Sequence, residues 1–160
     1  MYRNIVVPLD ASAVAEQVLP YVRDFVQNRA VKIHLVSVAP LAAVAAAPAA
    51  PVRLFPLVMS RADLELHVHE RDRIEQELTN YLRGIAIDLA QGSVTTHVEV
   101  RFGEPAAEII DYAQDANADL IAICTHGRTG LARWAYGSVA EKVMRHARCP
   151  VLLVRAKKEA

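Results

Sequence analysis

The sequence contains only two cysteines in 160 residues, too few for the disulfide framework that stabilises many small secreted proteins. Its cysteines and histidines also do not recur at the spacing of a four-ligand zinc site. Both absences predict a protein of a reducing compartment, without a structural zinc ion.

The sequence has no excess of charge of either sign, since 18 Lys and Arg residues balance 18 Asp and Glu residues. Proteins that bind nucleic acid do so largely with positive charge, which releases counterions from the phosphate backbone. DNA and RNA are therefore not expected as partners. A length of 160 residues, 53% of them hydrophobic, fits one compact domain over 1–160.

Long hydrophobic runs are also missing. The apolar run after Asn4 reaches Pro8 after three residues, which is far too short for the core of a signal peptide. The Ala-rich stretch 38–52 is shorter than a membrane span and contains three prolines. The sequence therefore predicts a cytoplasmic protein with no membrane segment.

Short apolar runs alternate with longer stretches of helical periodicity, which is typical of α/β proteins with a mainly parallel sheet. Pro20 lies inside the first helical stretch and should kink that helix, because proline lacks the amide hydrogen that a helix interior uses. The predicted strands are Asn4–Leu9, Val31–Val38, Val94–Arg101, Asp119–Ile123 and Pro150–Arg155, and the predicted helices are Ser12–Arg29, Arg61–Leu89, Pro105–Ala116 and Ser138–Ala147.

The third and fifth predicted strands differ in the pattern of their side chains. Polar and charged residues alternate with mostly apolar ones along 94–101, which indicates an edge strand with one face in water. The run Val151–Val154 is apolar on both sides. If this strand also lies at an edge, a second subunit could cover its unpaired backbone groups, which predicts a homodimer through Val151–Val154.

The segment 39–60 shows neither helical nor strand periodicity, and Arg53 is its only charged residue. We expect it to be a flexible loop that follows the second strand. Ligands of open α/β sheets bind outside the carboxyl ends of the strands, so this segment could be a binding loop or lid. A plain Ala/Pro linker fits the same composition.

The stretch 124–141 joins the fourth strand to the last helix and contains glycines that include Gly127 and Gly137. Glycine lets the backbone come close to a ligand because it has no Cβ. Ser138 and Glu141 have the spacing of a capping box, which would start the last helix at Ser138. The amides at that helix start could hold a phosphate, or the glycines could form turns and Ser138 could only cap the helix.

Two common nucleotide motifs do not fit the sequence. The Walker pattern requires a lysine directly after its last glycine, whereas Gly137 is followed by Ser138. The dinucleotide fingerprint requires glycines after the first strand, whereas Pro8–Ser12 contains none. A P-loop nucleotide hydrolase and an NAD or FAD site are therefore not expected.

Several stretches together resemble the universal stress protein family, and the resemblance covers nearly the whole chain. They are 7–12 (VPLDAS), 103–105 (GEP), 126–130 (HGRTG), 137–143 (GSVAEKV) and 149–154 (CPVLLV). The resemblance implies a three-layer α/β fold with an open five-stranded parallel sheet in the order 3-2-1-4-5. Such a fold is Rossmann-like, of the adenine nucleotide alpha hydrolase-like type. It also implies dimerisation through the last strand and, in one branch of the family, ATP binding.

The ATP-binding branch is marked by the pattern Gly, two residues, Gly, nine residues, Gly-Ser/Thr, whose later part Gly127, Gly137 and Ser138 fit. Cys124 stands where the pattern has its first glycine. The resemblance implies Asp10 and Val38 at the adenine, and ATP with Mg²⁺ or Mn²⁺ on its phosphates. The whole implied site is Pro8, Leu9, Asp10, Val38, Ile123, Cys124, Gly127, Arg128, Gly137, Ser138 and Val139.

Other candidate groups point away from metal or covalent chemistry. His67 and His69 are two residues apart on a predicted helix and would face different sides, so we expect no protein-made metal site. Cys124 and Cys149 fall at opposite ends of neighbouring strands and should be free thiols. Arg128 could face an anion or only water.

Three functions stay open on the sequence alone. The first is a stress-response sensor or signalling module that binds ATP or a related adenine nucleotide. In that function hydrolysis is expected to be absent or slow, because the glycine-rich stretch lacks a base or a carboxylate pair. The second is a dimeric interaction module that binds no nucleotide because Cys124 blocks the site. The third is a slow nucleotide hydrolase.

Overall fold

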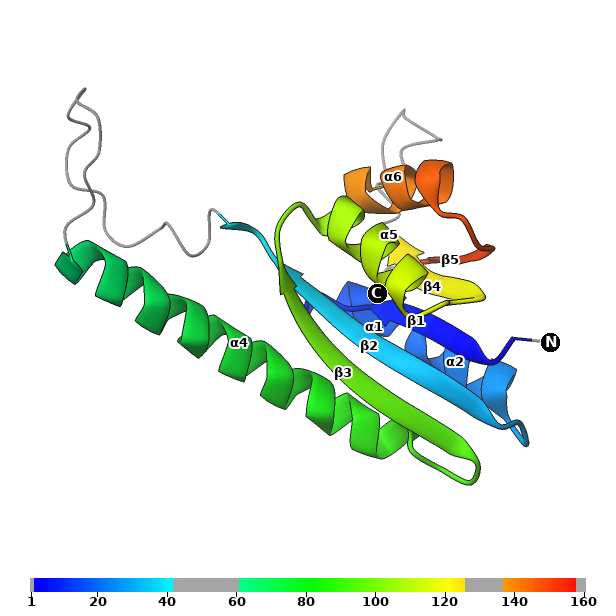
Figure 1. The fold of residues 1–160 in the computed structure, drawn as a ribbon. Helices are drawn as coiled ribbons and strands as arrows, with labels where there is room; N and C mark the ends of the chain where they lie inside the picture. The colour runs from blue at the N-terminus through cyan, green and yellow to red at the C-terminus, as the bar shows by residue number, and fades with distance from the viewer. Residues whose placement is uncertain (1, 42–60, 126–136, 158–160) are drawn as a thin grey trace.

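The computed structural model describes residues 2–41, 61–125 and 137–157, which form an open five-stranded sheet between two layers of helices (Figure 1). The strand pairings are parallel, in the order β3-β2-β1-β4-β5, so the predicted fold class and strand order are confirmed. The elements are β1 (Asn4–Pro8), α1 (Ala13–Glu16), α2 (Leu19–Val26), β2 (Val31–Ala39), α4 (Arg61–Leu89), β3 (Val94–Phe102), α5 (Pro105–Asp115), β4 (Leu120–Thr125), α6 (Ser138–His146) and β5 (Val151–Arg155).

Each face of the sheet has its own hydrophobic cluster. Helices α1, α2 and α4 cover one face, and α5 and α6 cover the other (Figure 1). Along β1, Ile5 and Val7 join the first cluster, whereas Val6 joins the second. The central strand is therefore apolar on both faces, as expected for a parallel strand that is covered on both sides. This packing fixes the strand ends from which the loops of the site begin.

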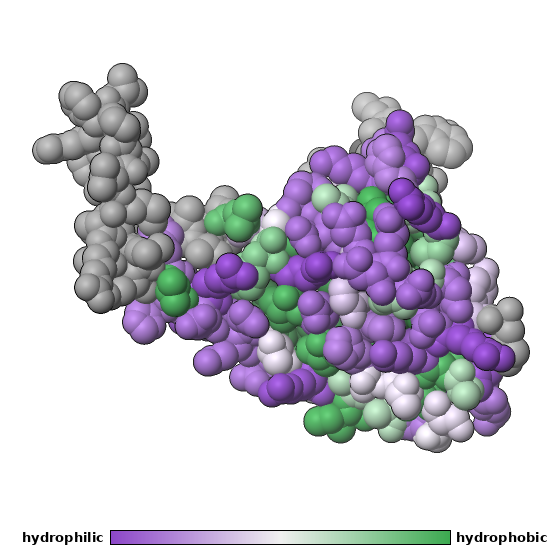
Figure 2. Space-filling model, in the orientation of Figure 1, coloured by the Kyte–Doolittle hydropathy of each residue, from purple (hydrophilic) through white to green (hydrophobic). Residues whose placement is uncertain are grey.

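The two edge strands of the sheet are β3 and β5. The predicted edge position of β3 is confirmed. The predicted alternation holds only at its amino end, where Thr95 and His97 are exposed, because the residues from Val98 on, Glu99 and Arg101 included, are all half-buried. Figure 2 shows that the face with α4 and α5 is mostly hydrophilic, with hydrophobic residues in scattered spots. On β5, by contrast, the half-buried residues Val151–Leu153 are all apolar.

The first predicted helix, Ser12–Arg29, is wrong as a single element. The chain forms α1 and then α2, with Pro20 in the first turn of α2. Proline is tolerated there because the first turn of a helix has no intrahelical partner for its amide hydrogens. After α2, Asn28 has a φ of 57°, a left-handed conformation that ends a helix.

The fourth strand is longer than predicted. It runs to Thr125 instead of Ile123, because Cys124 and Thr125 continue the pairing with β5. Cys124 and Cys149 are both free, as expected from their places at opposite ends of the β4–β5 pair.

The predicted capping box at the start of the last helix is wrong. Gly137 is the capping residue of α6, and Ser138 is already helical, with no side-chain cap at this helix start. The Gly137 amide donates a hydrogen bond of 3.0 Å to Thr125 Oγ1, which ties Gly137 to the end of β4 in a non-helical conformation ahead of the helix. A strand residue that the sequence analysis did not consider therefore sets where α6 begins.

Among the described residues, no helix is both long and apolar enough to cross a membrane. Residues 42–60 of the predicted loop, together with His126, Gly127 and Arg128, lie outside the described residues.

Candidate functional site

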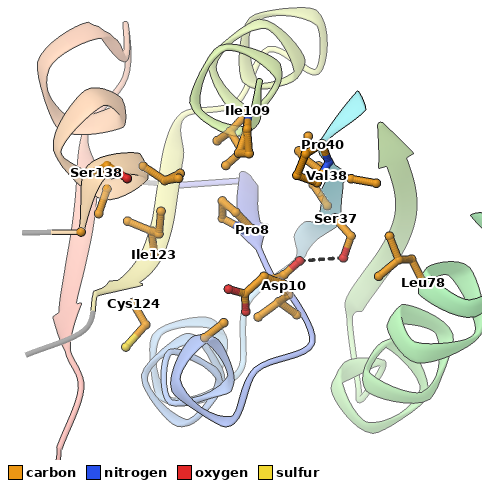
Figure 3. A pocket seen from close by; sticks show the side chains of 18 of the residues that line it. Pro8, Asp10, Ser37, Val38, Pro40, Leu78, Ile109, Ile123, Cys124 and Ser138 are labelled. Atoms are coloured by element: carbon orange, nitrogen blue, oxygen red, sulfur yellow. Dashed lines mark hydrogen bonds between the residues drawn. The ribbon is translucent and has the colours of Figure 1, made fainter. Parts of the chain in front are cut away.

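A cavity of about 600 Å³ opens at the carboxyl edge of the sheet, where the ends of β1, β2 and β4 meet the start of α6 (Figure 3). Ligands of open α/β sheets bind in this place. The structure brings together nine of the eleven residues implied by the resemblance, and Gly127 and Arg128 lie outside the described residues. The nine that line the cavity are Pro8, Leu9, Asp10, Val38, Ile123, Cys124, Gly137, Ser138 and Val139.

Helix side chains that the sequence analysis missed form the side walls of the cavity. Ile109 of α5 lies on one side, and Ile74 and Leu78 of α4 lie on the other. Figure 3 shows Ile109 and Leu78 pointing toward the strand ends from the two helical layers. These residues belong to apolar helix faces, and no local signal distinguishes a residue that reaches the cavity from one that packs on the sheet.

The turn after β1 forms the floor of the cavity and is tightly held. The Ser12 amide donates a hydrogen bond of 3.0 Å to Asp10 Oδ1, and Ser12 Oγ accepts one of 3.1 Å from the Ala15 amide at the start of α1. Ala11, between Asp10 and Ser12, has a φ of 61°, in the left-handed region that non-glycine residues rarely adopt. The turn therefore holds the Asp10 carboxylate in one place at the cavity.

Thr125 and Gly137 join β4 to α6 on the opposite side of the cavity. Thr125 is buried, and its hydroxyl oxygen accepts the Gly137 amide described above. A Cβ built on Gly137 would lie 3.7 Å from Thr125 Oγ1, an ordinary contact distance. The described residues around Gly137 therefore do not require glycine here. What the glycine provides is open space at the start of α6.

Cys124 is a half-buried thiol on the cavity wall. Burial raises the pKa of the Cys124 thiol, a hydrogen bond from the Thr125 amide opposes this, and the nearby charge of Asp10 raises the pKa again. The thiol is therefore neutral near pH 7, which is unlike the thiolate of a nucleophilic cysteine.

The charges of the described cavity lining are separated. Its ionisable acids are Asp10 and Glu77, and Glu77 Oε1 is paired at 2.8 Å with Nη1 of Arg73. At the other end, the first amides of α6 have no intrahelical partners and carry the positive end of the helix dipole. The cavity thus has amide donors at the start of α6 and a carboxylate acceptor at Asp10. In the described part of the chain, no three His, Cys, Asp or Glu side chains form a group that could hold a metal ion.

Comparisons with known proteins agree with this architecture. A universal stress protein of Methanocaldococcus jannaschii, MJ0531, is 29% identical over 159 residues, which cover 99% of this chain and 85% of that protein. The solved structure of MJ0577 from the same organism has a TM-score of 0.78 and 26% identity, and the match covers 99% of both chains.

A universal stress protein of Arabidopsis thaliana, solved with AMP bound, matches with a TM-score of 0.59. It is 15% identical, the match covers 97% of this chain and 92% of that chain, and the likeness shows the shared fold. The model of the universal stress protein family matches residues 1–155. This chain belongs to the universal stress protein family.

Proposed function

We propose that this protein binds an adenine nucleotide in the cavity at the carboxyl edge of the sheet and acts as a stress-response sensor or signalling module. The observation that carries the proposal is that the free amides at the start of α6 and the Asp10 carboxylate lie at opposite ends of one cavity. A nucleotide has the matching polarity, with an anionic phosphate end and a base that carries hydrogen-bond donors.

The phosphate end of the nucleotide would lie at the start of α6. The amides of Ser138 and Val139 are free of intrahelical partners, and Gly137 leaves the space that phosphate oxygens need. Gly127 and Arg128 would complete this end. Mg²⁺ or Mn²⁺ would be held mainly by the phosphates, because the described lining supplies only two carboxylates and Glu77 is already paired with Arg73.

The base end would lie at the turn after β1. Asp10 Oδ1 is used by the Ser12 amide, and Oδ2 has no hydrogen-bond partner among the described residues. An exocyclic amino group of adenine could donate to this oxygen, and Val38 would pack against the ring. Ile123 and Cys124 would flank the ribose. The solved Arabidopsis relative with AMP bound supports an adenine ligand for this fold.

Isothermal titration of the purified protein with ATP and Mg²⁺, repeated with AMP, tests this proposal. We expect binding, and a Gly137→Val variant should weaken it by about 100-fold because the side chain fills the space at the helix start. Ligand at 100 times its dissociation constant should also raise the free energy of unfolding by about 2.7 kcal/mol.

A matched control is Gly84→Val on α4, where a Cβ meets nothing within 4 Å. We expect this variant to bind like the wild type. If the wild-type protein binds neither nucleotide, the proposal is wrong and the interaction module without a nucleotide is favoured. If Gly137→Val binds as tightly as the wild type, the nucleotide does not lie at α6.

We also propose that the protein is a homodimer through β5. This strand lies at an edge of the sheet, and the residues Val151–Leu153 are apolar and only half-buried. An unpaired edge of this kind favours pairing with a second copy. Light scattering at micromolar concentration should give twice the mass of the chain, and a monomer would contradict this proposal.

A further inference from the structure

A buried hydroxyl lies beneath the turn that carries Asp10. Ser37 of β2 is 1% exposed, and its Oγ donates a hydrogen bond of 2.6 Å to the carbonyl oxygen of Leu9 (Figure 3). Ser37 also lines the cavity. No pattern in the sequence marks it, because β2 also contains Lys32 and His34 and nothing local separates Ser37 from them.

The Ser37 hydroxyl acts where the backbone pairing of β1 with β2 ends. The register of the two strands ends at Pro8 and Val36, and the Leu9 amide still donates to the carbonyl of Val36 at 2.8 Å. The carbonyl of Leu9 then receives its donor from the Ser37 side chain. Leu9 is thus bound to β2 through both its amide and its carbonyl, and a buried carbonyl needs such a partner.

The bond to Leu9 controls the direction in which the chain enters the Asp10 turn. Ala11 holds a left-handed conformation, and such a conformation persists only where the contacts around it enforce it. On the far side of Ala11, Ser12 makes those contacts through Asp10 and Ala15. On the near side, Leu9 is held by two hydrogen bonds, from its amide to the Val36 carbonyl and from Ser37 Oγ to its carbonyl, and the second of these comes from a side chain.

We propose that Ser37 is a positioning residue: by holding Leu9, it aims the Asp10 carboxylate and so makes the cavity select a ring with an amino group over one with a carbonyl. This rests on the proposed nucleotide function. A carboxylate oxygen accepts a hydrogen bond from the amino group of adenine and repels the carbonyl oxygen that hypoxanthine carries in its place. A site built to receive a donor discriminates strongly only when its acceptor is fixed.

Titrations with AMP and with inosine monophosphate test the selectivity. We expect the wild type to prefer AMP, and Ser37→Ala should lower the ratio of the two dissociation constants by about tenfold, mainly through weaker AMP binding. Ser37→Cys keeps a similar volume but has only a weak donor, so it should behave like the alanine variant. The matched control is Thr96→Ala, a half-buried hydroxyl of β3 outside the cavity, which should leave the ratio unchanged.

An unchanged ratio in Ser37→Ala would overturn the proposal. A loss with alanine that cysteine restores would also overturn it, because volume and not the hydrogen bond would then matter.

A second readout needs no nucleotide. Weaker hold on Leu9 should loosen the hydrogen bond from Ser12 to Asp10, so the Ser12 amide should exchange with solvent about tenfold faster in Ser37→Ala than in the wild type. If the wild type binds neither nucleotide but Ser12 exchange is accelerated, the nucleotide function fails while the positioning role stands. If Ser12 exchange is unchanged in both Ser37 variants, the positioning role is wrong.

Discussion

Two aspartates lie at opposite ends of β1, and their hydrogen bonds differ. At the amino end, Asp119 accepts the Arg3 amide on Oδ2 at 2.7 Å and the Asn4 amide on Oδ1 at 3.2 Å. At the carboxyl end, Asp10 accepts the Ser12 amide on Oδ1 alone, and it is exposed at the cavity.

The difference separates a carboxylate that serves the fold from one that is available to a ligand. Both oxygens of Asp119 accept backbone amides, so this carboxylate joins the start of β4 to the start of β1. Asp10 uses one oxygen to hold its own turn and leaves the other at the cavity. A carboxylate forms strong hydrogen bonds with amide donors. An aspartate therefore stabilises the protein at the amino end of β1, whereas at the carboxyl end an aspartate offers an acceptor to a ligand.

The largest expected effect comes from removing each carboxylate in turn. Asp119→Ala leaves two backbone amides without their acceptor and should lower the free energy of unfolding by about 2 kcal/mol, with nucleotide affinity unchanged. Asp10→Ala should weaken AMP binding about tenfold and change the free energy of unfolding by less than about 0.5 kcal/mol. Urea unfolding and calorimetric titration of both variants measure the two effects.

The distinction between the two aspartates is wrong if both variants lose stability or if both lose AMP affinity. A large loss of stability in Asp10→Ala would mean that the turn serves the fold more than the ligand. Weaker AMP binding in a folded Asp119→Ala variant would mean that the amino end of β1 is coupled to the cavity.

The sequence predicts the strands and their order because burial leaves a direct pattern along them. Val6 and its neighbours are apolar without interruption in the central strand, and the alternation on β3 marks an edge. The cavity residues on the strand ends are implied by the resemblance to the universal stress protein family, whereas the start of α6 could also be anticipated from the glycine and serine at 137–138.

The rest of the site depends on contacts between distant segments. Ser37 and Thr125 are polar residues near the ends of β2 and β4, and their roles appear only once Leu9 and Gly137 lie beside them. The capping box at Ser138 fails for a related reason, because Gly137, whose amide donates to the Thr125 hydroxyl, takes the capping position.

His34 has one ring nitrogen with a hydrogen-bond partner and one without, so it extends the comparison of Asp119 and Asp10 to the core. It lies on β2, is 4% exposed, and does not line the cavity. Its Nδ1 lies 2.9 Å from the hydroxyl of Tyr112, whereas its Nε2 has no hydrogen-bond partner among the described residues. Because Nε2 lies in the core without a hydrogen-bond partner, its burial should lower the stability of the protein.

The second expected effect acts on stability alone and is a loss of stability in acid. Burial, together with the smaller effects of the nearby Lys32 and His97, lowers the pKa of His34 to about 4. The unfolded chain, with an ordinary pKa of 6.5, takes up the proton first, so the stabilisation is complete above pH 6.5 and is lost as the pH falls toward 4. From pH 7 to pH 5 this loss amounts to about 2 kcal/mol.

Urea unfolding of the wild type and of His34→Gln at pH 7 and pH 5 measures this contribution. Each variant is compared with its own value at pH 7, so any general destabilisation by glutamine cancels. The wild type should lose about 2 kcal/mol more than His34→Gln, while His69→Gln, at an exposed position of α4 away from His34, should lose about as much as the wild type. Equal losses in the wild type and in His34→Gln would mean that His34 finds a partner for its proton in the folded protein. In that case, the contrast between Asp119, whose two oxygens both accept amides, and Asp10, which has one oxygen without a partner, could not be extended to polar atoms in the core of this fold.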